Sequence, residues 1–323
     1  MRRALVALIV ALAPAAVDAQ QPPPNITNGQ VRERAAGVPL ARDFDALVQG
    51  QQSAAWIGYA VPTVNKEMRS CCGDWNDGCC GSCRLENERN VSITGSSARQ
   101  PIPLEGSTHI SVLYRVEQGR IGKIRFYSAD CSLDAGGLTV HWLTGVRPAD
   151  SVALLERLAT AVADDMMRAK SDSAVGALAN HSDPSADAAL DRLLDAKMPE
   201  SIRRKALFWT GQTRGQRGLE RLFAIARQDS SAKMRGEAIF WIGQRAGQKA
   251  AAMIREAVDK DPELEVKKKA VFALSQLPPA EGVPLLITVA RTHRQPEVRR
   301  QAMFWLGQSK DPRALEFFAE VLK

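Results

Sequence analysis

The C-terminal half of the chain repeats one pattern of apolar and polar positions every 32 residues. The segments KALFWTGQ, EAIFWIGQ, KAVFALSQ and QAMFWLGQ place four phenylalanines in one register, at Phe208, Phe240, Phe272 and Phe304. A glutamine closes each segment, at Gln212, Gln244, Gln276 and Gln308. A period of 20–50 residues indicates an array of structural repeats in which each unit packs on its neighbours.

Within each unit, apolar residues recur at helical spacing on two consecutive segments. The first segment opens on an apolar residue followed by a cation, at Ile202, Met234, Val266 and Val298. The second segment carries another apolar column, at Leu190, Leu222, Ile254, Leu286 and Phe318. Pro184 and Pro312 mark helix starts, where the missing N–H costs no hydrogen bond. We therefore expect about five helix–turn–helix repeats over residues 171–323, preceded by a capping helix at residues 148–170.

The region before the array has strand patterns instead. Residues 108–116 alternate apolar and polar positions, residues 117–120 supply a turn, and residues 121–127 follow as a second strand, which predicts a β-hairpin. Residues 54–62 and 138–143 are two further apolar runs of strand length. We expect residues 43–147 to form a small α+β domain in which His109 and His141 have structural roles.

The first 19 residues have the parts of a secretory signal peptide. Arg2 and Arg3 form a basic start, residues 4–13 are apolar, and residues 17–19 offer a cleavage site. Ten apolar residues are half of the ~20 that a helix needs to cross a bilayer, and no later segment is long and apolar enough to be transmembrane. We therefore predict an exported, periplasmic or secreted protein. Residues 20–42 are rich in proline and polar side chains and are predicted to form a flexible arm.

Export changes the interpretation of the six cysteines, which are Cys71, Cys72, Cys79, Cys80, Cys83 and Cys131. An even number in an oxidising compartment indicates disulfides, so we predict a stapled loop tied to the body through Cys131, with fifteen pairings open. Cys80 and Cys83 also have the C-x-x-C spacing of redox thiols. The alternative function is therefore thiol–disulfide or metal chemistry at the cluster, although no strand pattern precedes the motif and no helix pattern follows it.

The net charge of +7 raises the question of an anionic partner. Residues 171–323 hold 25 basic and 19 acidic residues, whereas residues 20–170 hold 16 of each. The basic runs at residues 267–269 and 299–300 are interleaved with Glu263, Glu265 and Glu297, as on an ion-paired helix face. A nucleic-acid partner is therefore not expected.

The form V-R-x-x-A-x-x-x-L-G, which residues 298–307 show best, resembles the HEAT-repeat family, and more narrowly the bacterial HEAT-like repeats grouped with phycobilisome lyases. The resemblance covers residues 171–323, about half of the chain. It implies an α-solenoid whose usual role is to bind proteins. With its signal peptide and cysteine-rich segment, the chain also resembles exported HEAT-repeat proteins.

Enzymes occur among HEAT-like proteins, and they form a second, less favoured alternative. Those that resemble deoxyhypusine hydroxylase hold two irons with His-Glu pairs repeated on their first helices. No histidine of this chain precedes a glutamate, and His181 and His293 of the repeats occupy different positions in the period. A lyase role has no bilin-attaching residue to support it. We assign no catalytic, cofactor-binding or metal-binding residue and expect no cofactor.

A helical wheel separates the phenylalanine column from the core of each repeat. With Ile202 at the centre of the apolar face, Ala206, Trp209 and Thr210 lie beside it, whereas Phe208 lies between basic residues and the glutamine column. Trp209, Trp241 and Trp305 are assigned to the core. The phenylalanines could fill gaps between successive first helices, or they could bind a partner, because aromatic and arginine side chains dominate binding hot spots. The partner-binding candidates are Phe208, Phe240, Phe272, Phe304, Arg204, Lys268, Arg300, Gln212, Gln244, Gln276 and Gln308.

These patterns together predict a disulfide-stapled α+β domain followed by an all-α HEAT-like solenoid. The expected function is that of a non-enzymatic scaffold or adaptor that binds an unknown protein partner in the cell envelope.

Overall fold

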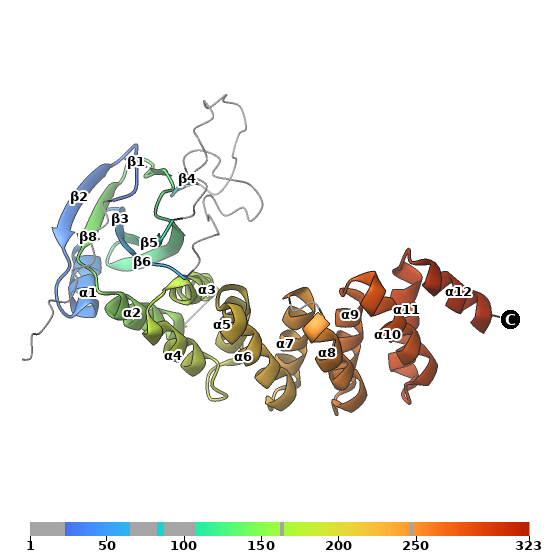
Figure 1. Cartoon of the computed structure of the whole chain (residues 1–323). Coiled ribbons are helices and arrows are strands. Elements are labelled where there is room, and N and C mark those ends of the chain that lie inside the picture. The colour runs from blue at the N-terminus through green and yellow to red at the C-terminus, as the bar shows by residue number, and fades with distance from the viewer. Residues whose placement is uncertain (1–22, 65–82, 87–106, 162–164, 246–247, 323) are drawn as a thin grey trace, which may run out of the picture.

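The structure is a computed structural model that describes residues 23–64, 83–86, 107–161, 165–245 and 248–322. Strands gather at one end of the molecule, and an extended row of helices runs from them to the C-terminus (Figure 1). The structure therefore has the two parts that the sequence predicts, an α+β region and a helical array.

Five strands form the main sheet in the order β2-β8-β3-β5-β6, and three two-residue strands form a second sheet in the order β1-β7-β4. The strand bounds are β1 Ile26–Thr27, β2 Gln30–Ala35, β3 Ala55–Pro62, β4 Cys83–Arg84, β5 His109–Glu117, β6 Arg120–Ser128, β7 Leu133–Asp134 and β8 Thr139–Thr144. The predicted hairpin is confirmed, because β5 and β6 pair antiparallel. β8 pairs parallel with both β2 and β3.

The central strands β8, β3 and β5 alternate between two apolar clusters, so the middle of the sheet is buried on both faces. On β3, Ile57 and Tyr59 face the helices and join a core that continues into the array. Trp56 points the other way and meets Trp142 of β8 in the second cluster. A Cβ at Gly58 would lie 2.9 Å from the Trp142 indole, so any larger residue at this position would displace the indole.

The predicted flexible arm is wrong from residue 26 onward. Residues 30–35 form β2, an edge strand paired along its length with β8, and helix α1 (Leu40–Gly50) follows. All six residues of β2 are exposed, and Arg32, Glu33 and Arg34 give the segment the polar composition of an arm. Charged side chains protect an exposed strand edge from pairing with other chains. The composition that suggested an arm therefore belongs to an edge strand.

Eleven further helices follow the sheet in the described residues. Their bounds are α2 Pro148–Thr160, α3 Asp165–Asn180, α4 Pro184–Leu193, α5 Glu200–Thr213, α6 Gly215–Gln228, α7 Ala232–Arg245, α8 Gln248–Lys260, α9 Leu264–Ser275, α10 Pro279–Thr292, α11 Pro296–Gln308 and α12 Pro312–Val321. From α3 to α12 they pair as five helical hairpins, and Pro184 and Pro312 begin second helices as predicted. α3 begins at Asp165, so the first repeat starts earlier than residue 171 and the preceding helix ends at Thr160.

Small residues allow the two helices of one repeat to cross closely. One column of the second helices consists of Ala186, Gly218, Ala250, Gly282 and Ala314, all of them buried. A Cβ on Gly218 would lie 2.3 Å from the carbonyl oxygen of Thr210, and one on Gly282 would lie 2.4 Å from that of Leu274. At these two crossings the second helix rests directly on the last turn of the first.

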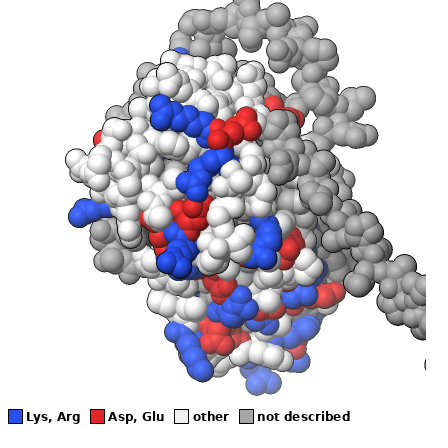
Figure 2. All heavy atoms as spheres, turned by 90° about the vertical axis from the view of Figure 1, so that its left-hand side faces the viewer, with Lys and Arg blue, Asp and Glu red and all other residues white. Residues whose placement is uncertain are grey.

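The face at the sheet end of the molecule carries charges of both signs, intermixed (Figure 2). Ion pairs join neighbouring elements of this region, such as Arg157 of α2 with Asp45 of α1, at 2.7 Å. Arg192 of α4 and Glu156 of α2 form another pair, also at 2.7 Å. This face therefore has no patch of one sign that would attract a highly charged polymer.

Candidate functional site

Eight aromatic rings form a continuous row along the first helices of the repeats, which we call the aromatic stripe. Its members, in spatial order, are Phe126, Trp209, Phe208, Trp241, Phe240, Phe272, Trp305 and Phe304. The centroids of neighbouring rings lie 4.7–5.9 Å apart throughout. The row begins on β6 of the sheet and crosses α5, α7 and α9 to α11. It therefore joins the α+β region and the array along one surface.

The four predicted phenylalanines remain partly accessible in this row. Phe208, Phe240 and Phe272 are half-buried, and Phe304 is 55% exposed. Both interpretations of the column describe part of what is seen. Phe208 and Phe272 each pack on the tryptophan of the next repeat, at 4.8 Å, and so fill a gap between first helices. Each ring also keeps an open edge, as a contact surface requires.

The assignment of the tryptophans to the core is correct for one of the three. Trp209 is 8% exposed and packs on Phe126 of the sheet. Trp241 and Trp305 are half-buried at the edge of the core, where they belong to the stripe. The difference arises because Trp209 faces the sheet, whereas the other two face only the first helix before them.

Charged side chains border the stripe, and the predicted cations there are paired. Arg204 lies 3.0 Å from Glu237, Lys268 lies 2.8 Å from Glu265, and Arg300 lies 3.5 Å from Glu297. These contacts agree with the ion-paired face expected from the interleaved charges. Exposed pairs contribute about 0–1 kcal/mol each to stability, so a bound partner can replace them at low cost.

A hollow of about 530 Å³ lies on the stripe between α7 and α9. Phe240 and Phe272 line it as nearly parallel rings, 7° apart, and Glu237, Lys268 and Lys269 border it. The aliphatic part of Lys269 lies over Gly236, where a Cβ would come within 2.6 Å of Cδ. The first helices on either side carry Arg204 and Lys268 at this register. The missing side chain at Gly236 thus leaves room for the aliphatic part of Lys269 beside the hollow.

The predicted glutamine column lies near the ends of the first helices, beyond the rings. Gln212 is half-buried, whereas Gln244, Gln276 and Gln308 are exposed. Gln276 donates a hydrogen bond to its neighbour Ser275, at 3.1 Å. Whether these glutamines and the phenylalanines bind a partner stays a prediction.

A second column, one residue after the first apolar position, holds buried cations that fasten each repeat to the one before it. Arg203 donates to the carbonyl of Leu194 at 3.0 Å and pairs with Asp229. Arg235 forms two bonds with Asp261, at 2.8 and 3.0 Å, and these hydrogen bonds raise the pKa of the Arg235 guanidinium. The charge pattern predicted ion pairs at these positions, but only the structure shows that they are buried.

Four buried polar side chains form a chain where the sheet meets the first repeat. The hydroxyl oxygens of Tyr114 and Tyr59 lie 2.7 Å apart, Tyr59 lies 2.8 Å from Ser151 Oγ, and Ser151 Oγ lies 2.8 Å from His181 Nε2. His181 Nδ1 lies 2.8 Å from the carbonyl oxygen of Ala177. None of the four side chains is exposed. Sequence analysis missed this chain, because its members stand far apart along the sequence and share no motif.

The directions of these bonds follow from the carbonyl, which can only accept. Nδ1 of His181 carries the ring proton and donates it to Ala177, so Nε2 of the neutral ring accepts from Ser151. Ser151 Oγ also bonds to the Tyr59 hydroxyl, which in turn shares a hydrogen bond with the Tyr114 hydroxyl. Burial lowers the pKa of His181 to about 4 and raises the pKa of Tyr59 to about 12, so every member is uncharged near neutral pH.

The other predicted residues are only partly within the described chain. Cys71, Cys72, Cys79 and Cys80 lie outside the described residues, as does the signal peptide. Cys131 is fully buried in the second cluster, beneath the short sheet that β4 and β7 share. Among the described residues, no group of three or more His, Cys, Asp and Glu side chains is placed to hold a metal ion. No helix of the described residues is long and apolar enough to cross a membrane.

The two strand histidines, for which structural roles are predicted, lie in different surroundings. His109 Nδ1 lies 2.9 Å from the hydroxyl oxygen of Thr108, at the exposed start of β5. His141 is half-buried on β8, where burial and the nearby Arg32 and Arg34 lower its pKa.

The helical repeats form an α-solenoid that begins beside the mixed sheet and carries the aromatic stripe along its first helices. Residues 219–292 and 258–323 match a family model described as HEAT repeats. Residues 219–323 of the helical array are therefore similar to HEAT repeats, as the sequence pattern predicts. No curated protein matches the chain. HEAT repeats are consistent with a scaffold for protein interactions.

Proposed function

We propose that the protein is an exported, non-enzymatic scaffold or adaptor that binds a protein partner with the aromatic stripe. The observation that carries this proposal is the unbroken contact of eight rings, seven of them partly accessible, across four repeats and the sheet. Stable association needs apolar anchors surrounded by polar groups that can re-pair, and the stripe has both. A continuous surface also suits an extended partner better than a compact ligand.

The experiment is capture of envelope proteins by purified variants that differ in one exposed apolar residue. Phe304→Ser removes an end of the stripe, whereas Leu315→Ser removes a side chain that is 68% exposed on α12, outside the stripe. We expect Phe304→Ser to retain clearly less of a captured protein than the unaltered chain does, and Leu315→Ser to retain the same amount. Equal capture by all three proteins would contradict the proposal.

Export is part of the proposal because of the first 19 residues. The basic start and the ten-residue apolar run are those of a signal peptide. Expression in a bacterial host followed by sequencing of the mature N-terminus tests it. We expect the mature chain to begin at Gln20 and to be found outside the cytoplasm. An uncleaved cytoplasmic chain would contradict export.

The cysteine-rich segment is proposed to be a stapled loop held to the body through Cys131. This is supported by the position of Cys131, which is fully buried in the second apolar cluster. The five other cysteines all lie within residues 71–83, so a partner for Cys131 within the chain comes from that segment. Counting free thiols in the denatured, unreduced exported protein tests this. We expect none, whereas reactive thiols or bound metal would favour redox or metal chemistry at the cluster.

A further inference from the structure

A polar hollow lies between the helices α4, α5 and α6, on the side of the repeats that the second helices form. Its volume is about 300 Å³. Its floor is buried, with Leu190 2% and Thr210 5% exposed and the side chain of Arg214 6% exposed. Its rim is open to solvent and carries Asp191, Arg217, Glu220 and Arg221. The hollow thus has the shape of a binding site for a small molecule or for a single side chain.

Three columns of the repeat become polar at this one place. Asp187 stands in the column of Leu219, Ala251, Val283 and Leu315. Thr210 stands in the column of Leu178, Ile242, Leu274 and Leu306. Arg221 stands in the column of Ala189, Met253, Leu285 and Phe317. All three replacements line the same hollow. Packing alone gives no reason for them, because apolar side chains fill these columns in every other repeat.

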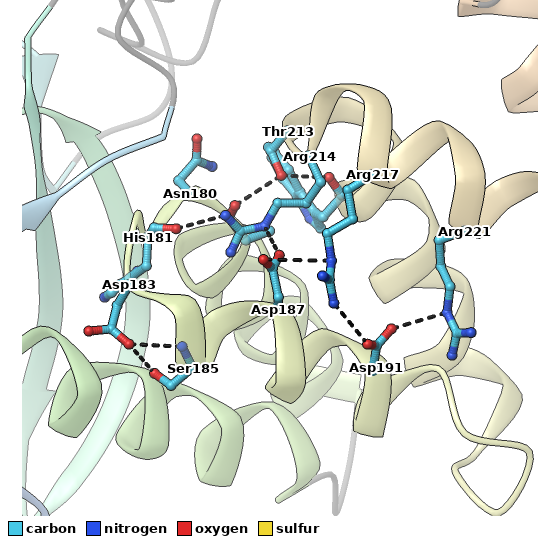
Figure 3. A network of polar contacts seen from close by, with 12 residues as sticks. Asn180, His181, Asp183, Ser185, Asp187, Asp191, Thr213, Arg214, Arg217 and Arg221 are labelled. Atoms are coloured by element: carbon cyan, nitrogen blue, oxygen red, sulfur yellow. Dashed lines mark hydrogen bonds and ion pairs between the residues drawn. The ribbon is translucent and has the colours of Figure 1, made fainter.

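The charged members form an alternating row across α4 and α6 (Figure 3). The Arg214 guanidinium lies 3.2 Å from Asp187, and Arg217 lies 3.6 Å from Asp187 and 3.2 Å from Asp191. Arg221 lies 3.1 Å from Asp191. Each carboxylate is therefore held between two arginines. Both carboxylates are already neutralised, so they do not call for a cationic ligand.

Five buried polar atoms of the lining have no hydrogen-bond partner among the described residues, and two of these also lack an ion-pair contact. These two are Arg214 Nη2 and Thr210 Oγ1. Arg214 Nη1 donates to the carbonyl of His181 at 2.8 Å, which fixes the guanidinium in place. Leaving a buried polar group unpaired costs about 1–3 kcal/mol, and more when it is charged. An acceptor that reached these atoms would relieve this cost.

From this geometry we propose that the hollow binds a carboxylate. A carboxylate offers two acceptor oxygens, one for Arg214 Nη2 and one for Thr210, and planar guanidinium groups match it well. Its single negative charge distinguishes it from phosphate, which carries nearly two near neutral pH and is therefore repelled more strongly by Glu220 at the rim. The site is independent of the aromatic stripe, which lies on the first helices.

Titration of the full exported chain with sodium acetate at constant ionic strength tests the proposal. The signals of the arginine Nε–H groups are followed by NMR. We expect saturable shifts of a small set of arginine signals, with a dissociation constant in the millimolar range. We expect inorganic phosphate to bind about tenfold more weakly than acetate or less. Linear, unsaturated drift with acetate would mean that only water fills the hollow and would overturn the proposal.

The variants separate the site from the rest of the surface. Thr210→Leu restores the residue type of the column, so the protein should fold, and acetate binding should weaken about tenfold or more. Thr210→Ser keeps the hydroxyl and should bind within about threefold of the unaltered chain. Arg227→Gln removes an exposed arginine elsewhere on α6 and serves as the matched control, with unchanged binding expected. Unchanged binding by Thr210→Leu would overturn the proposal.

The source of the carboxylate is decided by a tripeptide probe with a free or an amidated C-terminus. Tighter binding of the free-acid peptide than of acetate identifies a chain terminus as the ligand. Equal binding of the free-acid peptide and of acetate identifies a small carboxylate as the ligand. Binding of the amidated peptide as tight as that of the free acid would contradict recognition of a carboxylate.

Discussion

Acidification should weaken the joint between the sheet and the first repeat through His181. The ring is fully buried, donates from Nδ1 to Ala177 and accepts from Ser151 at Nε2. Protonation of Nε2 would remove the acceptor on which Ser151 depends and would place an unpaired charge in the core. The neutral ring is therefore the one that the folded protein holds.

The size of the effect follows from the two pKa values. An unfolded histidine has a pKa of about 6.5, whereas burial lowers that of His181 to about 4. Between these values the unfolded chain binds a proton that the folded chain does not. The stabilisation is therefore complete above pH 6.5 and is lost as the pH falls towards 4. At about 1.4 kcal/mol per pKa unit, the loss amounts to about 3 kcal/mol.

This loss of stability is measured by urea unfolding of the unaltered chain and of His181→Gln. The measurements are made at several pH values between about 7.5 and 4.5. The glutamine amide of the variant does not titrate. We expect the variant to have a free energy of unfolding about 1–3 kcal/mol lower than that of the unaltered chain at neutral pH, because the polar chain is broken. We expect the two free energies of unfolding to converge as the pH falls. His141→Gln is the control and should leave most of the slope in place. A constant difference between the unaltered chain and His181→Gln would refute the reasoning.

Two further predictions concern the packing of the repeats. Gly218→Ala places a Cβ 2.3 Å from a backbone carbonyl and should destabilise the chain by about 1–3 kcal/mol in urea unfolding, whereas Gly236→Ala meets only the flexible end of Lys269 and should be neutral or stabilising. Equal effects of the two would contradict the account of the helix crossing. Arg235→Met leaves Asp261 buried and uncompensated and should cost about 3–5 kcal/mol in the same assay. A loss below about 1 kcal/mol would show that Asp261 finds water instead.

The array could be predicted from sequence because a repeat displays its core many times. Five copies of one apolar column average out local irregularity, so the helix pairs and the starts at Pro184 and Pro312 follow from the 32-residue period. The sheet was predictable where strands alternate, as in β5 and β6. β2 was not, since an exposed edge strand has no apolar side to reveal it.

The stripe was only half predictable for a related reason. The wheel shows that Phe208 leaves the core of its own repeat, but contact with Trp241 depends on the distance between successive repeats. The buried chain through Ser151 and His181 depends on tertiary contacts alone, which no local pattern contains. The hollow at Thr210 did leave a trace in the sequence. It is visible as a polar residue in an apolar column once the columns are compared one by one.

The most direct test of the central claim is the affinity of the captured protein partner for variants of the stripe. Phe272→Gln removes a ring that lines the hollow between α7 and α9, and Leu315→Ser serves again as the control. Circular dichroism confirms that both variants are folded. Loss of an aromatic anchor costs about 2 kcal/mol or more, so we predict a dissociation constant about thirtyfold higher for Phe272→Gln and unchanged for Leu315→Ser. An unchanged constant for folded Phe272→Gln would contradict binding through the aromatic stripe.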